Sequence, residues 1–136
     1  PRFSELLGLV DHLVVSRSFA RRLTGASDPA TAAQALAASD RRAVVITCGD
    51  QGCWYWGSDE PGPARHQPAF EVDVVDTTGC GDVFHGAYAA TLAEGLDLAA
   101  RVRLAAATAS LKATRSGGQA GIPVRQAVQE FLEEQV

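Results

Sequence analysis

Short apolar runs alternate with amphipathic segments along the chain, which predicts strands that alternate with helices. Apolar runs at 13–15 and 43–47 predict buried strands. Further strands are expected at 53–56, after a turn at 49–52, and at 70–75, while 57–63 is expected to be a polar loop. Helices are expected at 3–9, 19–23, 28–38, 82–94, 98–113 and 125–133. The pattern is typical of an α/β fold with a mainly parallel sheet.

The stretch from Asp76 to Asp82 reads Asp-Thr-Thr-Gly-Cys-Gly-Asp and joins an expected strand to an expected helix. A glycine-rich turn at a helix N-terminus directs backbone N–H groups toward an anion. Gly79, Cys80 and Gly81 are therefore candidates for binding phosphoryl oxygens, and Asp82 is a candidate base for a substrate hydroxyl. The alternatives are an ordinary strand-to-helix turn and, for Asp82, a plain helix cap.

Composition limits the class of protein. The chain has 136 residues, 46% apolar and 21% charged, which suits one soluble domain or one lobe of a larger one. Its net charge of -4 argues against a nucleic-acid partner. We expect no membrane span and no signal peptide, and the start at Pro1 suggests a fragment. Cys48, Cys53 and Cys80 lack zinc-site spacing and are expected to be reduced thiols of a cytoplasmic protein.

Three stretches in this order resemble one family. They are 47–52, 76–86 and 114–123, the last ending Gly-Gly-Gln-Ala-Gly-Ile-Pro. The central stretch resembles the D-T-x-G-A-G-D-x-F motif of the PfkB, or ribokinase-like, carbohydrate kinases, with Cys80 at the usual alanine position. The last stretch is most similar to a ketohexokinase-like or sulfofructose-kinase-like branch. The resemblance implies a three-layer α/β/α fold of which residues 1–136 form the C-terminal nucleotide-binding and catalytic part, without the N-terminal part and its small β lid.

The resemblance also implies an activity, namely ATP-dependent phosphorylation of a sugar hydroxyl. ATP, Mg²⁺ and a monovalent cation such as K⁺ are the implied cofactors, and a small-molecule sugar is the implied partner. The full-length kinase is expected to pair as a homodimer through the lid. Asp82 is then the base, while Gly79, Cys80 and Gly81 form an anion hole and Thr77 lies with them beside the nucleotide phosphates.

Two further groups of residues gain a role by the same resemblance. Thr47, Gly49 and Gly52 are implied to lie near ATP, whereas their pattern alone predicts a hairpin turn. Asp76 and Thr78 match residues that help bind the monovalent cation, and carbonyl oxygens of the loop 114–119 are further candidates for that ion. The alternative for Asp76 and Thr78 is a turn held by their own side-chain hydrogen bonds.

One position departs from the family pattern. Ser16-Arg17-Ser18-Phe19 stands where relatives usually have N-x-x-E, whose glutamate organises magnesium. Phe19 has no oxygen to offer, so either Mg²⁺ is held by phosphates and water or the protein is catalytically impaired. Two rival functions remain: a nucleoside or vitamin-alcohol kinase of the same fold, and a non-catalytic nucleotide- or sugar-binding regulator, which the missing glutamate favours.

Overall fold

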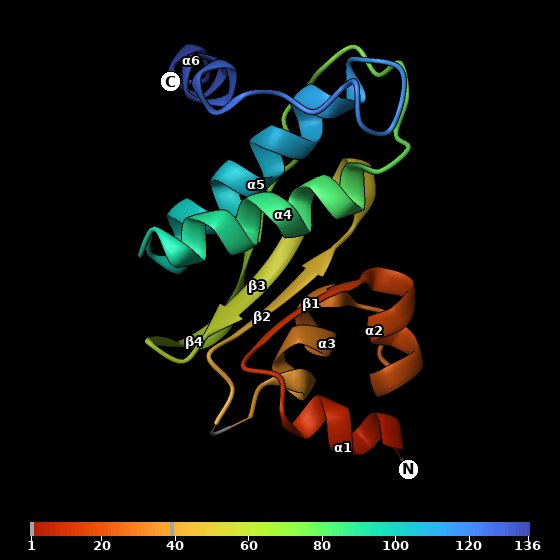
Figure 1. Cartoon of the computed structure of the whole chain (residues 1–136). Coiled ribbons are helices and arrows are strands. Elements are labelled where there is room, and N and C mark those ends of the chain that lie inside the picture. Colours follow the sequence, from red (N-terminus) through yellow and green to blue (C-terminus); the bar gives the residue numbers. More distant parts are fainter. Residues whose placement is uncertain (1, 39) are drawn as a thin grey trace. The chain divides into compact units, whose positions relative to one another are not determined.

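The structure, a computed structural model, describes residues 2–38 and 40–136, which divide into two compact units at residue 66 (Figure 1). The first unit contains a sheet and short helices. Its elements are α1 (Arg2–Gly8), β1 (His12–Ser16), α2 (Arg17–Thr24), α3 (Pro29–Leu36), β2 (Ala43–Thr47), the 3-10 turn η1 (Gly49–Gln51), β3 (Cys53–Gly57) and β4 (Glu60–Gln67). Strands and helices alternate as far as β2, so the α/β prediction is confirmed.

The four strands form one sheet in the order β1-β2-β3-β4. β1 and β2 are parallel, with Leu13 opposite Val44, because α2 and α3 carry the chain back between them. β2 and β3 are antiparallel, with Val45 opposite Tyr55, because the short connection 48–52 reverses the chain at once. The sheet of this part of the protein is therefore mixed, where a mainly parallel one was expected.

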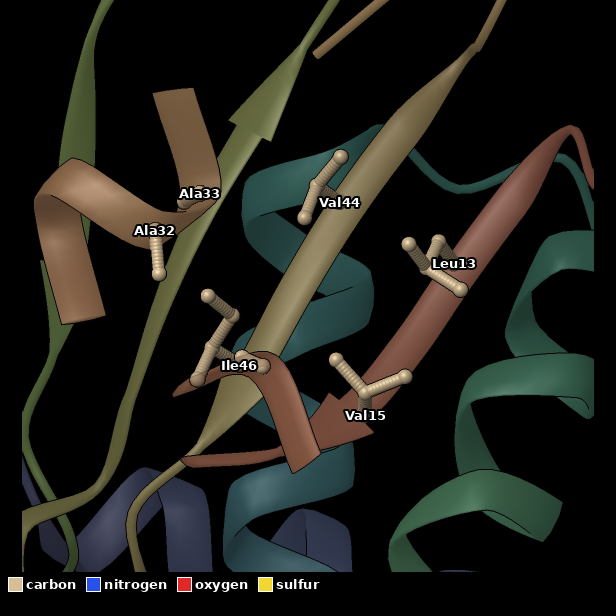
Figure 2. Close-up of a cluster of buried hydrophobic side chains, with 7 residues drawn as sticks. Leu13, Val15, Ala32, Ala33, Val44 and Ile46 are labelled. Carbon is tan, nitrogen blue, oxygen red and sulfur yellow. The ribbon is translucent and has the colours of Figure 1, made fainter. Parts of the chain in front are cut away.

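The core of the first unit lies between the sheet and the two helices that follow β1. Leu13, Val15, Val44 and Ile46 share one face of the sheet, and α2 and α3 pack against that face (Figure 2). The alanines of α3 make this packing close, since Ala33 is fully buried. The ends of these helices show ordinary capping: the Asp28 carboxylate accepts the N–H of Thr31 at 2.8 Å before α3, and Gly25 ends α2 in the left-handed region.

The strand β4 was missed by the sequence prediction, which placed a polar loop at 57–63. Its sequence, Glu-Pro-Gly-Pro-Ala-Arg-His-Gln, contains two prolines and no apolar alternation. Proline is tolerated on an edge strand, where one row of N–H groups needs no partner, and β4 lies at the edge of the sheet. Side chains across the sheet also hold it, because His66 stacks on Trp54 at 4.7 Å between ring centroids.

The second unit is helical. Its elements are α4 (Cys80–Ala93), α5 (Leu98–Ala113) and α6 (Arg125–Glu134), and α4 lies along α5 (Figure 1). Its core cluster contains Leu104, Ala107 and Val128, and Phe70 meets Phe131 edge-on at 5.4 Å. In the described part of the chain, no helix is long and apolar enough to cross a membrane.

The predicted strand at 70–75 is wrong. These residues form no strand, and Val74 and Val75 are mostly exposed. The N–H of Val75 donates instead to the carbonyl of Ala113 at the end of α5, at 2.8 Å. The apolar alternation was real, but in the described structure this segment pairs with a helix end rather than with a strand.

Candidate active site

The glycine turn begins α4 two residues earlier than the sequence indicated. Gly79 is the N-cap, with φ of 76°, and Cys80 is the first helical residue. A positive φ at this point suits glycine, which has no Cβ to clash with the backbone. Asp82 therefore lies within the first turn of α4 rather than at its start, and its side chain is exposed. A carboxylate in this position is favoured by the helix dipole.

The backbone N–H groups of this turn differ in whether they already have a hydrogen-bond acceptor. The N–H of Cys80 donates to the carbonyl of Thr77 at 3.1 Å, so it already has a partner within the turn. Within residues 2–38 and 40–136, no acceptor is recorded for the N–H groups of Gly81 and Asp82. These are two of the donors that every helix leaves unsatisfied in its first turn. The turn therefore presents donors to an anion beside the Asp82 carboxylate.

Asp76 links this turn to other parts of the second unit. Its Oδ1 accepts the N–H of Thr78 at 2.9 Å, and its Oδ2 accepts the N–H of Gly117 at 2.9 Å. Its backbone carbonyl accepts a hydrogen bond from Nζ of Lys112, also at 2.9 Å. Hydrogen bonds from the side chain and backbone of Thr78 hold the pKa of Asp76 well below its usual range, with Gly117 and the charge of Lys112 adding to the effect.

The loop after α5 lies against the glycine turn. A Cβ placed on Gly79 would lie 3.6 Å from the Cα and carbonyl oxygen of Gly118, and one on Gly118 would lie 3.9 Å from the Thr78 methyl. Gly121 closes this loop on itself, since a Cβ there would lie 3.2 Å from both the Arg115 Cβ and the Gly117 oxygen. The two glycine-rich segments are thus in van der Waals contact, and glycine is favoured by the positive φ of Gly79 and Gly117 and by the tight fit at Gly121.

These contacts bear on the predicted monovalent cation. Asp76 and Thr78 lie together as the resemblance implied, but each oxygen of Asp76 already accepts a hydrogen bond. The loop 114–119, expected to offer carbonyl oxygens, contributes the N–H of Gly117 instead. The arrangement matches the alternative of a turn held by its own side chains. The Lys112 ammonium already lies against the Asp76 carbonyl, and its charge would repel a second cation there, so the residues present do not fit a monovalent cation well.

Lys112 was given no role by the sequence prediction. It is the only lysine among twelve basic residues, and its side chain is fully buried. The sequence signal that could have pointed to a role for Lys112 was a single lysine in an alanine-rich helix of a chain whose other basic residues are arginines.

Cys80, which precedes Gly81 in the turn, donates its thiol to the carbonyl of Ala109 at 3.5 Å, and burial raises the pKa of that thiol.

His85 lies one turn beyond the donors. Its side chain is exposed, and its Nδ1 lies 2.7 Å from the carbonyl of Gly81, so that nitrogen donates the hydrogen bond. This contact holds the imidazole against the first turn of α4.

The candidate nucleotide residues of the first unit form a tight turn after β2. Thr47 ends that strand and donates its hydroxyl to the carbonyl of Val15 at 3.4 Å. Gly49 and Gly52 both have positive φ, and the N–H of Gly52 donates to the carbonyl of Gly49 at 3.1 Å. Their role toward ATP stays a prediction, as does that of Thr77.

Ser16 and Phe19, which depart from the family's N-x-x-E pattern, have structural roles here. Oγ of Ser16 accepts the N–H of Phe19 at 3.3 Å and so caps α2. The Phe19 ring meets that of Phe3 edge-on, with 5.4 Å between centroids.

In the described part of the chain, no three His, Cys, Asp or Glu side chains are grouped to hold a metal ion. The predicted free thiols are found at all three cysteines.

Comparisons with known proteins give the same picture as the motifs. Residues 1–125 match the family described as pfkB family carbohydrate kinase. The chain is 46% identical over 90 residues to the ribokinase of Bacillus subtilis, which covers 65% of this chain and 29% of that protein. It is 33% identical over 134 residues to the ribokinase of Haemophilus influenzae, covering 95% of this chain and 43% of that protein.

A solved structure agrees in shape as well as in sequence. The ribokinase of Arabidopsis thaliana, determined with ribose and ATP, superposes with a TM-score of 0.83 and 30% identity, covering 95% of this chain and 43% of the other. The chain thus spans less than half the length of these relatives. The ketohexokinase-like or sulfofructose-kinase-like branch stays a prediction. Because the family match extends over residues 1–125, the chain belongs to the pfkB family of carbohydrate kinases.

Proposed function

We propose that the full-length protein transfers the γ-phosphoryl group of ATP to a hydroxyl of a sugar. The observation that carries this proposal is the first turn of α4, where the N–H groups of Gly81 and Asp82 point out of the helix end beside the Asp82 carboxylate. Donors for an anion and a base for a hydroxyl thus occur within one helical turn. Phosphoryl transfer to an alcohol needs both groups.

The proposed reaction is a single displacement at phosphorus. The Asp82 carboxylate takes the proton of the sugar hydroxyl as its oxygen bonds to the γ-phosphorus of ATP. The bond from that phosphorus to the β–γ bridging oxygen breaks, and ADP leaves with the electron pair. The N–H groups of Gly81 and Asp82, at the turn that begins with Gly79, bind the phosphoryl oxygens on which negative charge is spread in the transition state.

The nucleotide is proposed to arrive as its magnesium complex. Mg²⁺ keeps several waters and is readily carried by the phosphates themselves, so it needs few protein ligands. This fits a chain in which Phe19 replaces the glutamate of the family pattern. Thr47, Gly49 and Gly52 are proposed to contact ATP, and Thr77 to lie beside its phosphates.

The proposal is tested by replacing the base. In the full-length protein, Asp82→Asn keeps the size of the side chain but cannot accept the proton, and we expect kcat to fall by about 10²–10⁴-fold. Asp73→Asn is the matched control, because Asp73 is also exposed and lies before the turn. ADP release is measured with a panel of sugars, and ATP affinity by calorimetry. Unchanged turnover in Asp82→Asn, with ATP binding intact, would refute the assignment.

A second candidate is a non-catalytic nucleotide- or sugar-binding regulator. Phe19 favours it, because its ring packs on Phe3 where the family pattern has a metal-organising glutamate. Tight ATP or sugar binding by the wild-type protein, without ADP release from any sugar, nucleoside or vitamin alcohol of the panel, supports the regulator. Release of ADP only with a nucleoside or a vitamin alcohol supports the rival kinase.

A further inference from the structure

Lys112 is the buried charge that the proposed reaction leaves unused. Its side chain has no exposed surface, and it lies in the last turn of α5. Burying an ammonium group is costly unless hydrogen bonds and nearby negative charge or dipoles compensate it. The C-terminal end of a helix supplies part of that compensation. The remaining contacts of Lys112 therefore indicate what the charge is for.

These contacts converge on Asp76. Nζ of Lys112 donates to the Asp76 carbonyl at 2.9 Å, and the neighbouring Ala113 carbonyl accepts the N–H of Asp76 at 3.0 Å. The end of α5 therefore holds the peptide groups on both sides of Asp76. The Asp76 carboxylate in turn holds Thr78 and Gly117. Lys112 thus lies at the base of a connected set of hydrogen bonds that ends at the glycine turn.

The charge of Lys112 also reaches the start of α4. Burial raises the pKa of the Cys80 thiol, and the Lys112 charge opposes that increase. Hydrogen bonds from Thr78 and Gly117 lower the pKa of Asp76, and the Lys112 charge acts in the same direction. A fixed positive charge beside backbone donors strengthens their attraction for an anion, most of all where water is excluded.

We propose that Lys112 is a positioning residue whose buried ammonium is a built-in cation beneath the phosphoryl-binding turn. It holds Asp76, and through it Thr78 and the first turn of α4, and it adds positive potential at the site. Because this charge is covalently part of the chain and would repel a second cation at Asp76, phosphoryl transfer needs no added monovalent cation. The inference rests on the proposed function, since it assumes that the turn binds a phosphoryl group.

The first test needs no variant. Full-length wild-type protein is assayed for ADP release in KCl, NaCl and tetramethylammonium chloride at equal ionic strength. We expect rates that agree within about twofold, because the cation is already in place. A rate that depends on K⁺ and is lost in tetramethylammonium would overturn the inference, while leaving Asp82 as the base.

The second test removes the charge. Lys112→Met keeps much of the length but neither charge nor donor, and Lys112→Arg keeps both. Arg103→Met is the matched control, because it removes a cation from the same helix at a side chain that lies over Phe70. For Lys112→Met we expect kcat to fall at least about tenfold with the KM for the sugar little changed, partial recovery in Lys112→Arg, and little effect of the control.

The outcomes separate this inference from the proposed function. Full activity of a folded Lys112→Met, together with an inactive Asp82→Asn, refutes the inference alone. If Lys112→Met does not fold, as judged by circular dichroism, the salt comparison on the wild-type protein decides. If the wild-type protein phosphorylates nothing, the proposed function fails, and the inference is then decided by ATP titration calorimetry: equal affinity in KCl and tetramethylammonium chloride supports it, and a requirement for K⁺ refutes it.

Discussion

The carboxylate of Asp76 accepts a hydrogen bond from the N–H of Gly117, 41 residues further along the chain, at 2.9 Å. The same carboxylate accepts the N–H of Thr78 at 2.9 Å. One side chain therefore fixes both the glycine turn before α4 and the loop after α5. An ionised carboxylate therefore fixes the two loops relative to each other, so we expect their conformation to change when that carboxylate is protonated at low pH.

The first prediction concerns that response. Because the folded protein holds the pKa of Asp76 below the ordinary value of 3.8, the ionised carboxylate stabilises the fold above that value. This contribution is lost as the pH falls toward the lower folded-state pKa. Asp76→Asn should therefore lower the urea midpoint clearly at pH 7 and by less at about pH 3. An equal loss at both pH values would show that the charge is not what matters.

Asp76→Asn also places an amide where two N–H donors now find an acceptor. We expect the turn to shift and kcat to fall by up to about 10²-fold, since small displacements of catalytic groups have effects of that size. The sugar KM should change little if Asp76 acts only through the turn.

The second prediction separates the two glycines of the turn. Gly79 has φ of 76°, so Gly79→Ala should lower the free energy of unfolding by about 1–2 kcal/mol. Gly81 lies in ordinary helical conformation, and a Cβ added there would meet no other atom within 4 Å, so Gly81→Ala should leave stability equal or slightly higher. Urea unfolding measures both. A comparable loss in the two variants would contradict this reading of the turn.

Gly81→Ala has a further use. Because it leaves the fold intact, any rise in the KM for ATP reports how closely the phosphates approach the first turn of α4. An unchanged KM and kcat would mean that the phosphoryl group does not come within contact of Gly81.

The third prediction concerns the core in Figure 2. Ile46 is fully buried between β2 and the helices of the first unit. Ile46→Val should cost about 0.5–1.5 kcal/mol of unfolding free energy and Ile46→Ala about 2–5 kcal/mol, because the second leaves a larger cavity. Val74→Ala, at a mostly exposed position, should change it by less than about 0.5 kcal/mol. Chemical denaturation of each variant measures the differences.

Much of the fold follows from local sequence. Continuous apolar runs predicted β1 and β2, and the ends of α2 and α3 follow ordinary local preferences, with Gly25 after α2 and the Asp28 cap before α3. β4 was missed because its prolines argue against a strand, and only its place at the sheet edge makes them harmless. The segment 70–75 was predicted as a strand because alternation shows which side chains share a face but not which backbone supplies the hydrogen bonds.

The candidate site divides in the same way. The spacing of glycines before Asp82 predicted a turn into a helix, and the structure has that turn. Lys112 was not predicted, because its partner is a backbone carbonyl 36 residues earlier, and no local pattern marks such a contact. The hydrogen bond from the Cys80 N–H to the carbonyl of Thr77 could not be predicted either, because it depends on how tightly the turn closes.

The last carbonyl of α5 has a consequence for local unfolding. The carbonyl of Ala113 accepts the N–H groups of both Val75 and Asp76, at 2.8 and 3.0 Å. Those two amides belong to neither helix nor strand, and they exchange with solvent hydrogen when their hydrogen bonds to the end of α5 break. The exchange rates of Val75 and Asp76 therefore report how often the segment before the glycine turn separates from the end of α5.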